Sequence, residues 1–176
     1  MSRVVAPDGA RADDIGTVNG HDVSPADWLE REFGHIAAGE IRTLPFFRPT
    51  IPVRACGFTL FERQWLGCLL TPWMLSLLIL PGPGQAWPIR RPGDRLALRL
   101  PCGNVGFMVG ETAPLRQYLA CSLMSPLAAA LNAAQAVSLA EHGARRALSL
   151  PLSDADAPRC GERRAWLGRL TESRHA

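Results

Sequence analysis

The chain contains no lysine, so all 19 of its Lys-plus-Arg side chains are arginine, and they are mixed along the sequence with 16 acidic residues. The resulting formal net charge is only +3. A nucleic-acid-binding surface usually shows a stronger basic patch interleaved with aromatic residues. We therefore expect no nucleic-acid partner.

Paired cysteine motifs are also missing. The five cysteines lie far apart, and their odd number leaves at least one unpaired: Cys56, Cys68, Cys102, Cys121 and Cys160. Such usage suits a reducing compartment. The first residues contain no apolar run of signal-peptide length, so the sequence predicts a cytoplasmic protein.

No short motif indicates an enzyme, a metal or a cofactor. The four histidines, His21, His35, His142 and His175, have no second ligand at a zinc-site spacing. The sequence PGPG at 81–84 has proline where a phosphate cradle needs backbone N–H groups, and no Gly-Lys-Ser/Thr follows it. Catalytic residues, metals and cofactors are therefore all predicted to be absent.

One long uncharged stretch dominates the chain, with no charged residue between Arg63 and Arg90. A membrane-spanning helix needs about 20 continuous apolar residues, but Pro72 interrupts the run and Pro81 begins the turn that ends it. We predict two strands, at about 64–71 and 73–80, and no stable membrane insertion. Because both faces of each strand are apolar, the sheet is either covered on both sides or keeps one face for a partner.

The flanking segments predict further elements. Ser24 and Pro25 begin a helix at 25–38, and an alanine stripe marks a second helix at 132–148. Further strands are expected at 57–62, 94–101, 105–109 and 118–124, and a short helix at 163–170. This order predicts an α+β two-layer sandwich, a twisted, mainly antiparallel sheet of about five or six strands with helices on one face. Residues 1–22 are predicted to be a flexible tail, 23–170 a single domain and 171–176 a C-terminal tail.

Two cysteines and three carboxylates are the remaining candidates for chemistry. Cys68 and Cys121 are flanked by apolar residues on predicted strands, which favours inert buried thiols over nucleophiles. Glu62, Asp94 and Glu111 border predicted strands. A carboxylate pair is conceivable there, but salt bridges with nearby arginines are the simpler interpretation.

Three long stretches carry a family resemblance: FTLFERQWLGCLLTPWMLSLLILPGPGQAWP (58–88), GDRLALRLPCGNVGFMVGE (93–111) and YLACSLMSPL (118–127). They resemble the HybE/HupJ/HoxT family of nickel-iron hydrogenase assembly chaperones. The resemblance implies a small α+β sandwich and a cytoplasmic, non-enzymatic maturation factor. It further implies, as partner, the precursor of the iron-sulfur small subunit, which carries a twin-arginine signal peptide and which the chaperone holds back until assembly is complete. The resemblance also allows other hydrogenase maturation factors as further partners. Residues 1–22, Cys102 and Cys160 lie outside what the resemblance carries over.

A receptor for such a signal peptide needs carboxylates beside an adaptable apolar surface. The candidate partner-binding residues are Glu62, Trp65, Trp73, Met74, Trp87, Asp94 and Glu111. Our hypothesis is that Glu62 and Glu111 pair with the arginines while an open face of the central strands holds the apolar part. The alternative is a thiol or iron-sulfur handling factor, or an oxygen-protection factor, that uses Cys68 and Cys121. A third hypothesis is a peripheral membrane protein.

Overall fold

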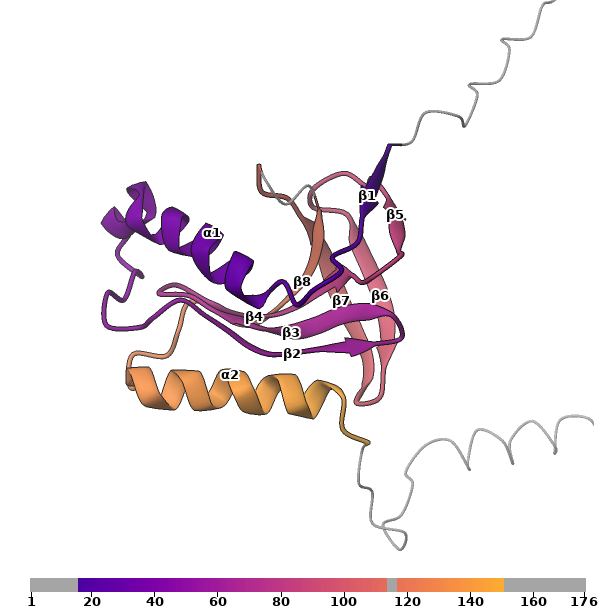
Figure 1. The fold of residues 1–176 in the computed structure, drawn as a ribbon. Coiled ribbons are helices and arrows are strands. Elements are labelled where there is room, and N and C mark those ends of the chain that lie inside the picture. The colour runs from indigo at the N-terminus through magenta and orange to yellow at the C-terminus, as the bar shows by residue number, and fades with distance from the viewer. Residues whose placement is uncertain (1–15, 114–116, 151–176) are drawn as a thin grey trace, which may run out of the picture.

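The computed structural model describes residues 16–113 and 117–150. In chain order the elements are β1 (Thr17–Asn19), α1 (Ala26–Ala38), the 3-10 helix η1 (Glu40–Thr43), β2 (Arg54–Phe61), β3 (Gln64–Leu70), β4 (Leu75–Pro81), β5 (Ala86–Pro88), β6 (Arg95–Leu100), β7 (Gly103–Gly110), β8 (Tyr118–Met124) and α2 (Ala133–Ala147). Six strands form one antiparallel sheet in the order β2-β3-β4-β8-β7-β6, and β1 pairs with β5 (Figure 1). The α+β class and the six-stranded antiparallel sheet are confirmed.

The predicted strand pair around Pro72 is the β3-β4 hairpin. Its register runs without a break from Gln64 opposite Pro81 to Leu70 opposite Leu75. The turn is closed by Thr71, whose N–H donates to the Met74 carbonyl at 2.9 Å and whose hydroxyl oxygen accepts the Met74 N–H at 3.1 Å. A proline at the next position costs nothing, because no strand partner needs its missing N–H.

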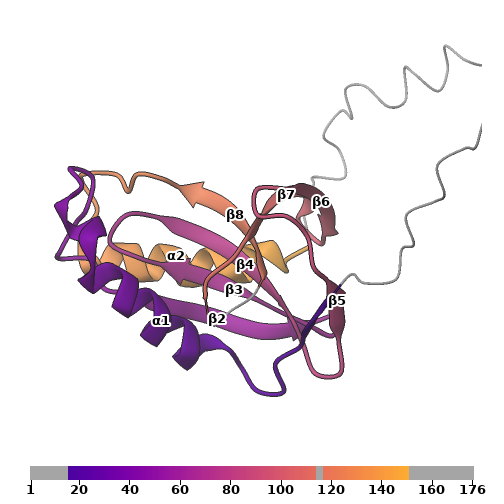
Figure 2. The same ribbon diagram turned by 90° about the horizontal axis from the view of Figure 1, so that it is seen from above.

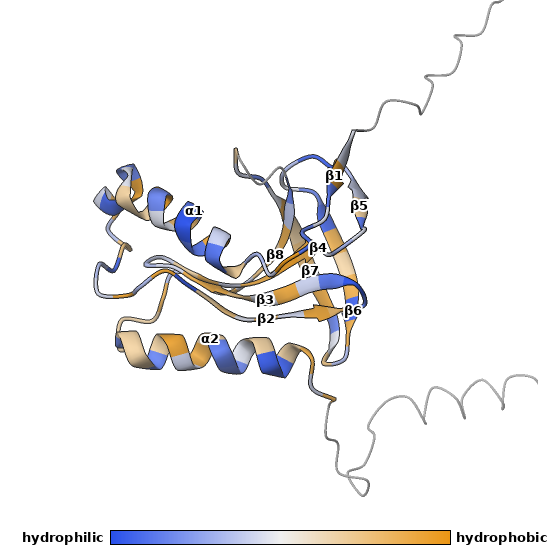
Figure 3. Ribbon diagram, viewed as in Figure 1, coloured by the Kyte–Doolittle hydropathy of each residue, from blue (hydrophilic) through white to orange (hydrophobic). Residues whose placement is uncertain are grey.

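The two helices lie on opposite faces of this hairpin, so the predicted placement of helices on one face is wrong (Figures 1 and 2). Leu66 and Cys68 pack with the alanine stripe of α2, whereas Leu69 and Leu78 pack with Leu29 and other residues of α1. Alternation places these two sets on opposite sides of the sheet. Because β3 and β4 are apolar on both faces, each face needs its own cover, and the hydrophobic colour on them lies between the helices (Figure 3).

Strands β8, β7 and β6, which we call the wing, continue the sheet past both helices (Figure 1). On the α2 side the wing is buried, where Phe107 and Val109 of β7 join the core with Leu96 and Leu98 of β6. On the α1 side, Met108 remains 45% exposed. The helices therefore cover the central strands completely and leave one face of the wing accessible.

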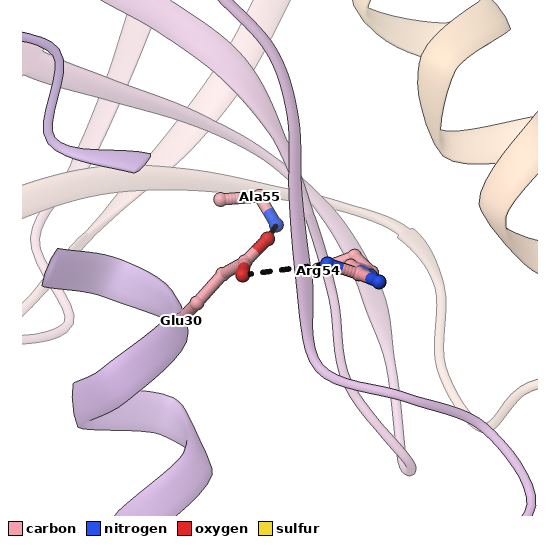
Figure 4. Close-up of polar contacts among 3 residues, drawn as sticks. All are labelled: Glu30, Arg54 and Ala55. Atoms are coloured by element: carbon pink, nitrogen blue, oxygen red, sulfur yellow. Dashed lines mark hydrogen bonds and ion pairs between the residues drawn. The ribbon is translucent and has the colours of Figure 1, made fainter. Parts of the chain in front are cut away.

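The edge strand β2 is covered by α1. Glu30 of α1 accepts the Ala55 N–H at 3.0 Å and makes an ion pair with Arg54 at 3.7 Å (Figure 4). Gly57, which has a positive φ of 65°, occupies the register shift of β2 and lies against α2, where an added Cβ would come within 2.7 Å of Ala144. Both helices thus fix the path of this strand.

The predicted boundary of the N-terminal tail at residue 22 is wrong. Within it, β1 pairs with β5, Gly20 donates to the Gln85 carbonyl at 2.8 Å, and the Trp65 indole donates to the His21 carbonyl at 2.8 Å. Backbone pairing orders this segment, which composition alone does not reveal because Val18 is its one buried apolar side chain. Residues 1–15, the predicted helix at 163–170 and the tail at 171–176 lie outside the described residues. Neither described α-helix has the length and apolarity to cross a bilayer.

Candidate partner-binding groove

An apolar groove of about 460 Å³ lies on the accessible face of the wing, next to α1. The residues that shape it are Met74, Arg95, Gly106, Met108, Gly110 and Tyr118. Register places Arg95 opposite Met108 and Met108 opposite Ala120, so the groove follows a row of residues across β6, β7 and β8.

Two glycines of β7 leave room for the groove. A Cβ on Gly106 would meet no atom within 4 Å, so the space above this residue is open. A Cβ on Gly110 would lie 2.5 Å from the Tyr118 ring, and its absence lets this ring lie across β7. Tyr118 also packs edge-on against Phe33 of α1, with ring centroids 6.2 Å apart. The tyrosine thus forms the wall between groove and helix, and burial raises its pKa.

The walls of the groove are adaptable because two of them are methionines, Met74 and Met108, whose unbranched thioethers fit many shapes. Charge is found only at the margins. Arg95 lies on the β6 side, and Glu111 directly follows Gly110 at the end of β7. Within residues 16–113 and 117–150, neither Arg95 nor Glu111 forms an ion pair. The arrangement suits an apolar segment with a cationic neighbour.

Of the seven predicted partner-binding residues, three lie at or beside the groove. Met74 lines it, Glu111 follows its last strand residue, and Asp94 precedes Arg95. The Asp94 carboxylate already accepts the Arg91 N–H, at 3.3 Å, in the turn before β6. Glu111, one residue beyond the groove lining, makes no hydrogen bond or ion pair within the described residues, so its carboxylate has no partner there.

The three predicted tryptophans have structural contacts instead. The Trp65 indole donates a hydrogen bond to the His21 carbonyl. Trp73 is 8% exposed and stacks on Phe47 with ring centroids 6.3 Å apart, and Trp87 of β5 packs against the core. Glu62 lines a separate hollow of about 200 Å³ with Leu98 and Arg99. The hypothesis of an open face on the central strands is wrong, since α1 and α2 cover both faces.

Sequence reasoning missed Met108, Tyr118 and Arg95. A signal for Met108 was present, because it is the large apolar residue between the inward-facing Phe107 and Val109. On an alternating strand such a residue points away from the core. Tyr118 and Arg95 depend on which strands are neighbours in the sheet, which the local pattern does not contain.

The four cysteines that the structure describes show no reactive arrangement. Cys56 and Cys68 face each other across β2 and β3, and burial raises the pKa of the Cys68 thiol to about 12. Burial also raises the pKa of Cys121, with a smaller contribution from nearby Cys102. Protonated thiols are poor nucleophiles and poor metal ligands. In the part of the chain that the structure describes, no three His, Cys, Asp or Glu residues are grouped to hold a metal. The thiol hypothesis gains no support.

Comparisons with known proteins agree with the resemblance. The family model described as "[NiFe]-hydrogenase assembly, chaperone, HybE" matches residues 24–169. The chain is 43% identical over 152 residues to the hydrogenase-2 operon protein HybE of Escherichia coli K12, covering 86% of this chain and 94% of that protein. It is 30% identical over 162 residues to the hydrogenase expression/formation protein HupJ of Bradyrhizobium diazoefficiens, covering 86% and 92%.

The fold agrees as well. The solution structure of HybE from Escherichia coli superimposes with a TM-score of 0.65 at 42% identity, covering 83% of this chain and 90% of that one. An α+β core with an accessible wing is thus found in a chain whose sequence and fold both match one family. The protein belongs to the HybE family of nickel-iron hydrogenase assembly chaperones.

Proposed function

We propose that this protein is a cytoplasmic chaperone that binds the precursor of a nickel-iron hydrogenase small subunit at its twin-arginine signal peptide. It holds the precursor until assembly with the nickel-iron subunit is complete and catalyses no reaction itself. The groove on the wing is the observation that carries this proposal. It is an adaptable apolar surface with a carboxylate at one end.

A twin-arginine signal peptide combines paired arginines with an apolar segment. The groove offers Met74, Met108 and Tyr118 for the apolar segment, and binding would remove the exposed part of Met108 from water. Glu111 lies at the end of the groove and can accept guanidinium hydrogen bonds. Arg95 on the β6 side repels a second cation, which favours placing the paired arginines near Glu111.

Dependence on the signal peptide is the first test. The purified protein is mixed with the small-subunit precursor, or with the same subunit lacking its signal peptide, and complexes are quantified after crosslinking. We expect a complex with the complete precursor and at least about tenfold less without the signal peptide, which corresponds to roughly 1.4 kcal/mol. Equal crosslinking of both forms would contradict signal-peptide binding.

The groove itself is tested with Met108→Glu, because a carboxylate there would lose hydration when an apolar segment covers it. Leu123→Glu is the matched control. Leu123 is also 45% exposed on a wing strand but packs beside Gly143 of α2, on the opposite face. Precursor affinity is expected to fall at least about tenfold for Met108→Glu and to stay unchanged for Leu123→Glu. Equal losses for both variants would place the site elsewhere.

The role of the carboxylate is tested with Glu111→Gln and Glu62→Gln, measured singly. Glu62 borders the separate hollow on the α2 side, so its variant serves as the charge-matched control. Glu111→Gln is expected to weaken precursor binding about fivefold or more at low salt and less at high salt, because an exposed ion pair is screened. Wild-type affinity of Glu111→Gln at low salt would remove this residue from the site.

A further inference from the structure

The strand β6 forms one edge of the main sheet. It pairs with β7 from Arg95 opposite Met108 to Leu100 opposite Gly103, and no other described strand pairs with it. The opposite edge, β2, is treated differently, because Glu30 of α1 accepts a backbone N–H from that strand. Within the described residues, no such contact covers the β6 edge.

The ladder shows which backbone groups point to this edge. Val109 donates its N–H to the Asp94 carbonyl at 2.8 Å. Bonded and non-bonded pairs alternate along an antiparallel ladder, so Leu96 and Leu98 direct their backbone groups to β7. The N–H and carbonyl groups of Arg95, Ala97 and Arg99 therefore point away from the sheet. They form a template three residues long for an added strand.

The side chains of these residues define which strand can be added. Arg95, Ala97 and Arg99 are all exposed, and neither arginine forms an ion pair with a described residue. An added strand would place its residues beside these positions, where opposite charges stabilise a cross-strand pair and like charges destabilise it. The edge thus favours a strand with carboxylates at alternate positions.

A second copy of this chain does not meet that requirement. In a symmetric antiparallel pairing centred on Ala97, Arg95 of one copy would lie opposite Arg99 of the other, and the reverse. Like charges directly opposite each other oppose such a pairing. The arginines that protect the edge from self-association are also the groups that would select an acidic strand.

We propose that the β6 edge binds an extended acidic segment of a protein partner by strand addition, with backbone hydrogen bonds to Arg95, Ala97 and Arg99 and carboxylates beside the two arginines. Its backbone contacts lie at the sheet edge and not in the groove, although the Arg95 side chain borders both surfaces. Its test needs no hydrogenase subunit, so its failure is distinguishable from failure of the proposed function.

The probe is a capped peptide of alternating glutamate and valine, seven residues long, and the readout is amide hydrogen exchange of the full chain by NMR. We expect slower exchange of the Arg95, Ala97 and Arg99 amides when the peptide is present, and no change at Leu96 and Leu98, which already face β7. A peptide of the same length with an N-methyl group on every residue keeps its charge but has no backbone N–H on either edge, so it cannot complete the ladder. It is expected to give no protection.

Charge selection is tested with Arg99→Glu, which lies outside the groove, and with Arg42→Glu in η1 as the matched control. Arg99→Glu is expected to lower the affinity for the acidic peptide about fivefold or more, and Arg42→Glu is expected to leave this affinity unchanged. Equal binding of a lysine-valine peptide or of the N-methylated peptide would overturn the proposal. The proposal would also be overturned if the protein bound phosphatidylglycerol vesicles while the acidic peptide protected none of the three amides.

Discussion

A single hydrogen bond, from the Trp65 indole to the His21 carbonyl, connects the first described residues to the β3 strand. Trp65→Phe keeps most of the ring but removes this donor. We expect the free energy of unfolding to fall by about 1 kcal/mol, the usual net worth of one such bond. The Gly20 and His21 amides should then exchange faster by NMR. Trp73→Phe, which removes no indole hydrogen bond within the described residues, should leave both exchange rates unchanged.

The buried thiol of Cys68 predicts a pH dependence. Its pKa is raised from 9.0 to about 12 by burial, so the folded chain keeps its proton where the unfolded chain releases it. Stability is therefore complete below pH 9 and falls as the pH rises from about 9 towards 12. Iodoacetamide at pH 8 should modify exposed Cys102 before Cys68, which should react only on unfolding. Mass spectrometry measures both reactions. Equally fast labelling of both cysteines would contradict this.

The residue roles were the least predictable part of the site. The sequence identifies aromatic and acidic residues beside an apolar run only by their type, yet Trp65, Trp73 and Trp87 make contacts within the fold. Whether an aromatic side chain faces a partner depends on what folds against it, and Phe47 and His21 lie far from their tryptophans in sequence. Met74 and Glu111 lie at or next to the groove because they are in a turn and at a strand end, which remain at the surface.

At the scale of elements, the contact between β2 and α2 depends on Gly57. Its φ of 65° is unfavourable for a residue with a side chain, and an added Cβ would lie 2.7 Å from Ala144. Gly57→Ala is expected to destabilise the protein by about 2–3 kcal/mol in urea unfolding. Gly34→Ala is the control, because a Cβ in the middle of α1 meets nothing within 4 Å. It should stabilise the protein by up to about 1 kcal/mol.

Most element positions could be predicted from the sequence because their signals are local. Pro72 separates β3 from β4, the alternation of leucine with arginine gives β6, and the capping box of Asn132 and Gln135 begins α2. The short strand β1 could not be predicted, since three residues pair with β5 through backbone groups that every sequence carries. Nor could the sides on which the helices lie, because β3 and β4 are apolar on both faces.

At the scale of the molecule, Arg48 links the loop between η1 and β2 to the loop between β8 and α2. It lies between η1 and β2, and its guanidinium donates to the carbonyls of Ala128 and Leu131, just before α2. Arg48→Ala is expected to lower the free energy of unfolding by about 2–4 kcal/mol, because two charge-assisted bonds are lost. Arg48→Lys should recover only part of this, since an ammonium lacks the planar fork. Urea denaturation measures both, and an unchanged midpoint for Arg48→Ala would contradict the role.

The β3-β4 hairpin is enclosed between two helices, so its side chains are not part of the surface that a partner can reach. The residues of this hairpin are interior, whereas the groove and the β6 edge are built from exposed positions of the wing. If the wing binds the precursor as proposed, substitutions on its surface can change which precursor is bound without disturbing the packing of the hairpin. An exchange of wing surface residues between two family members should carry client preference with it, whereas an exchange of the hairpin should not.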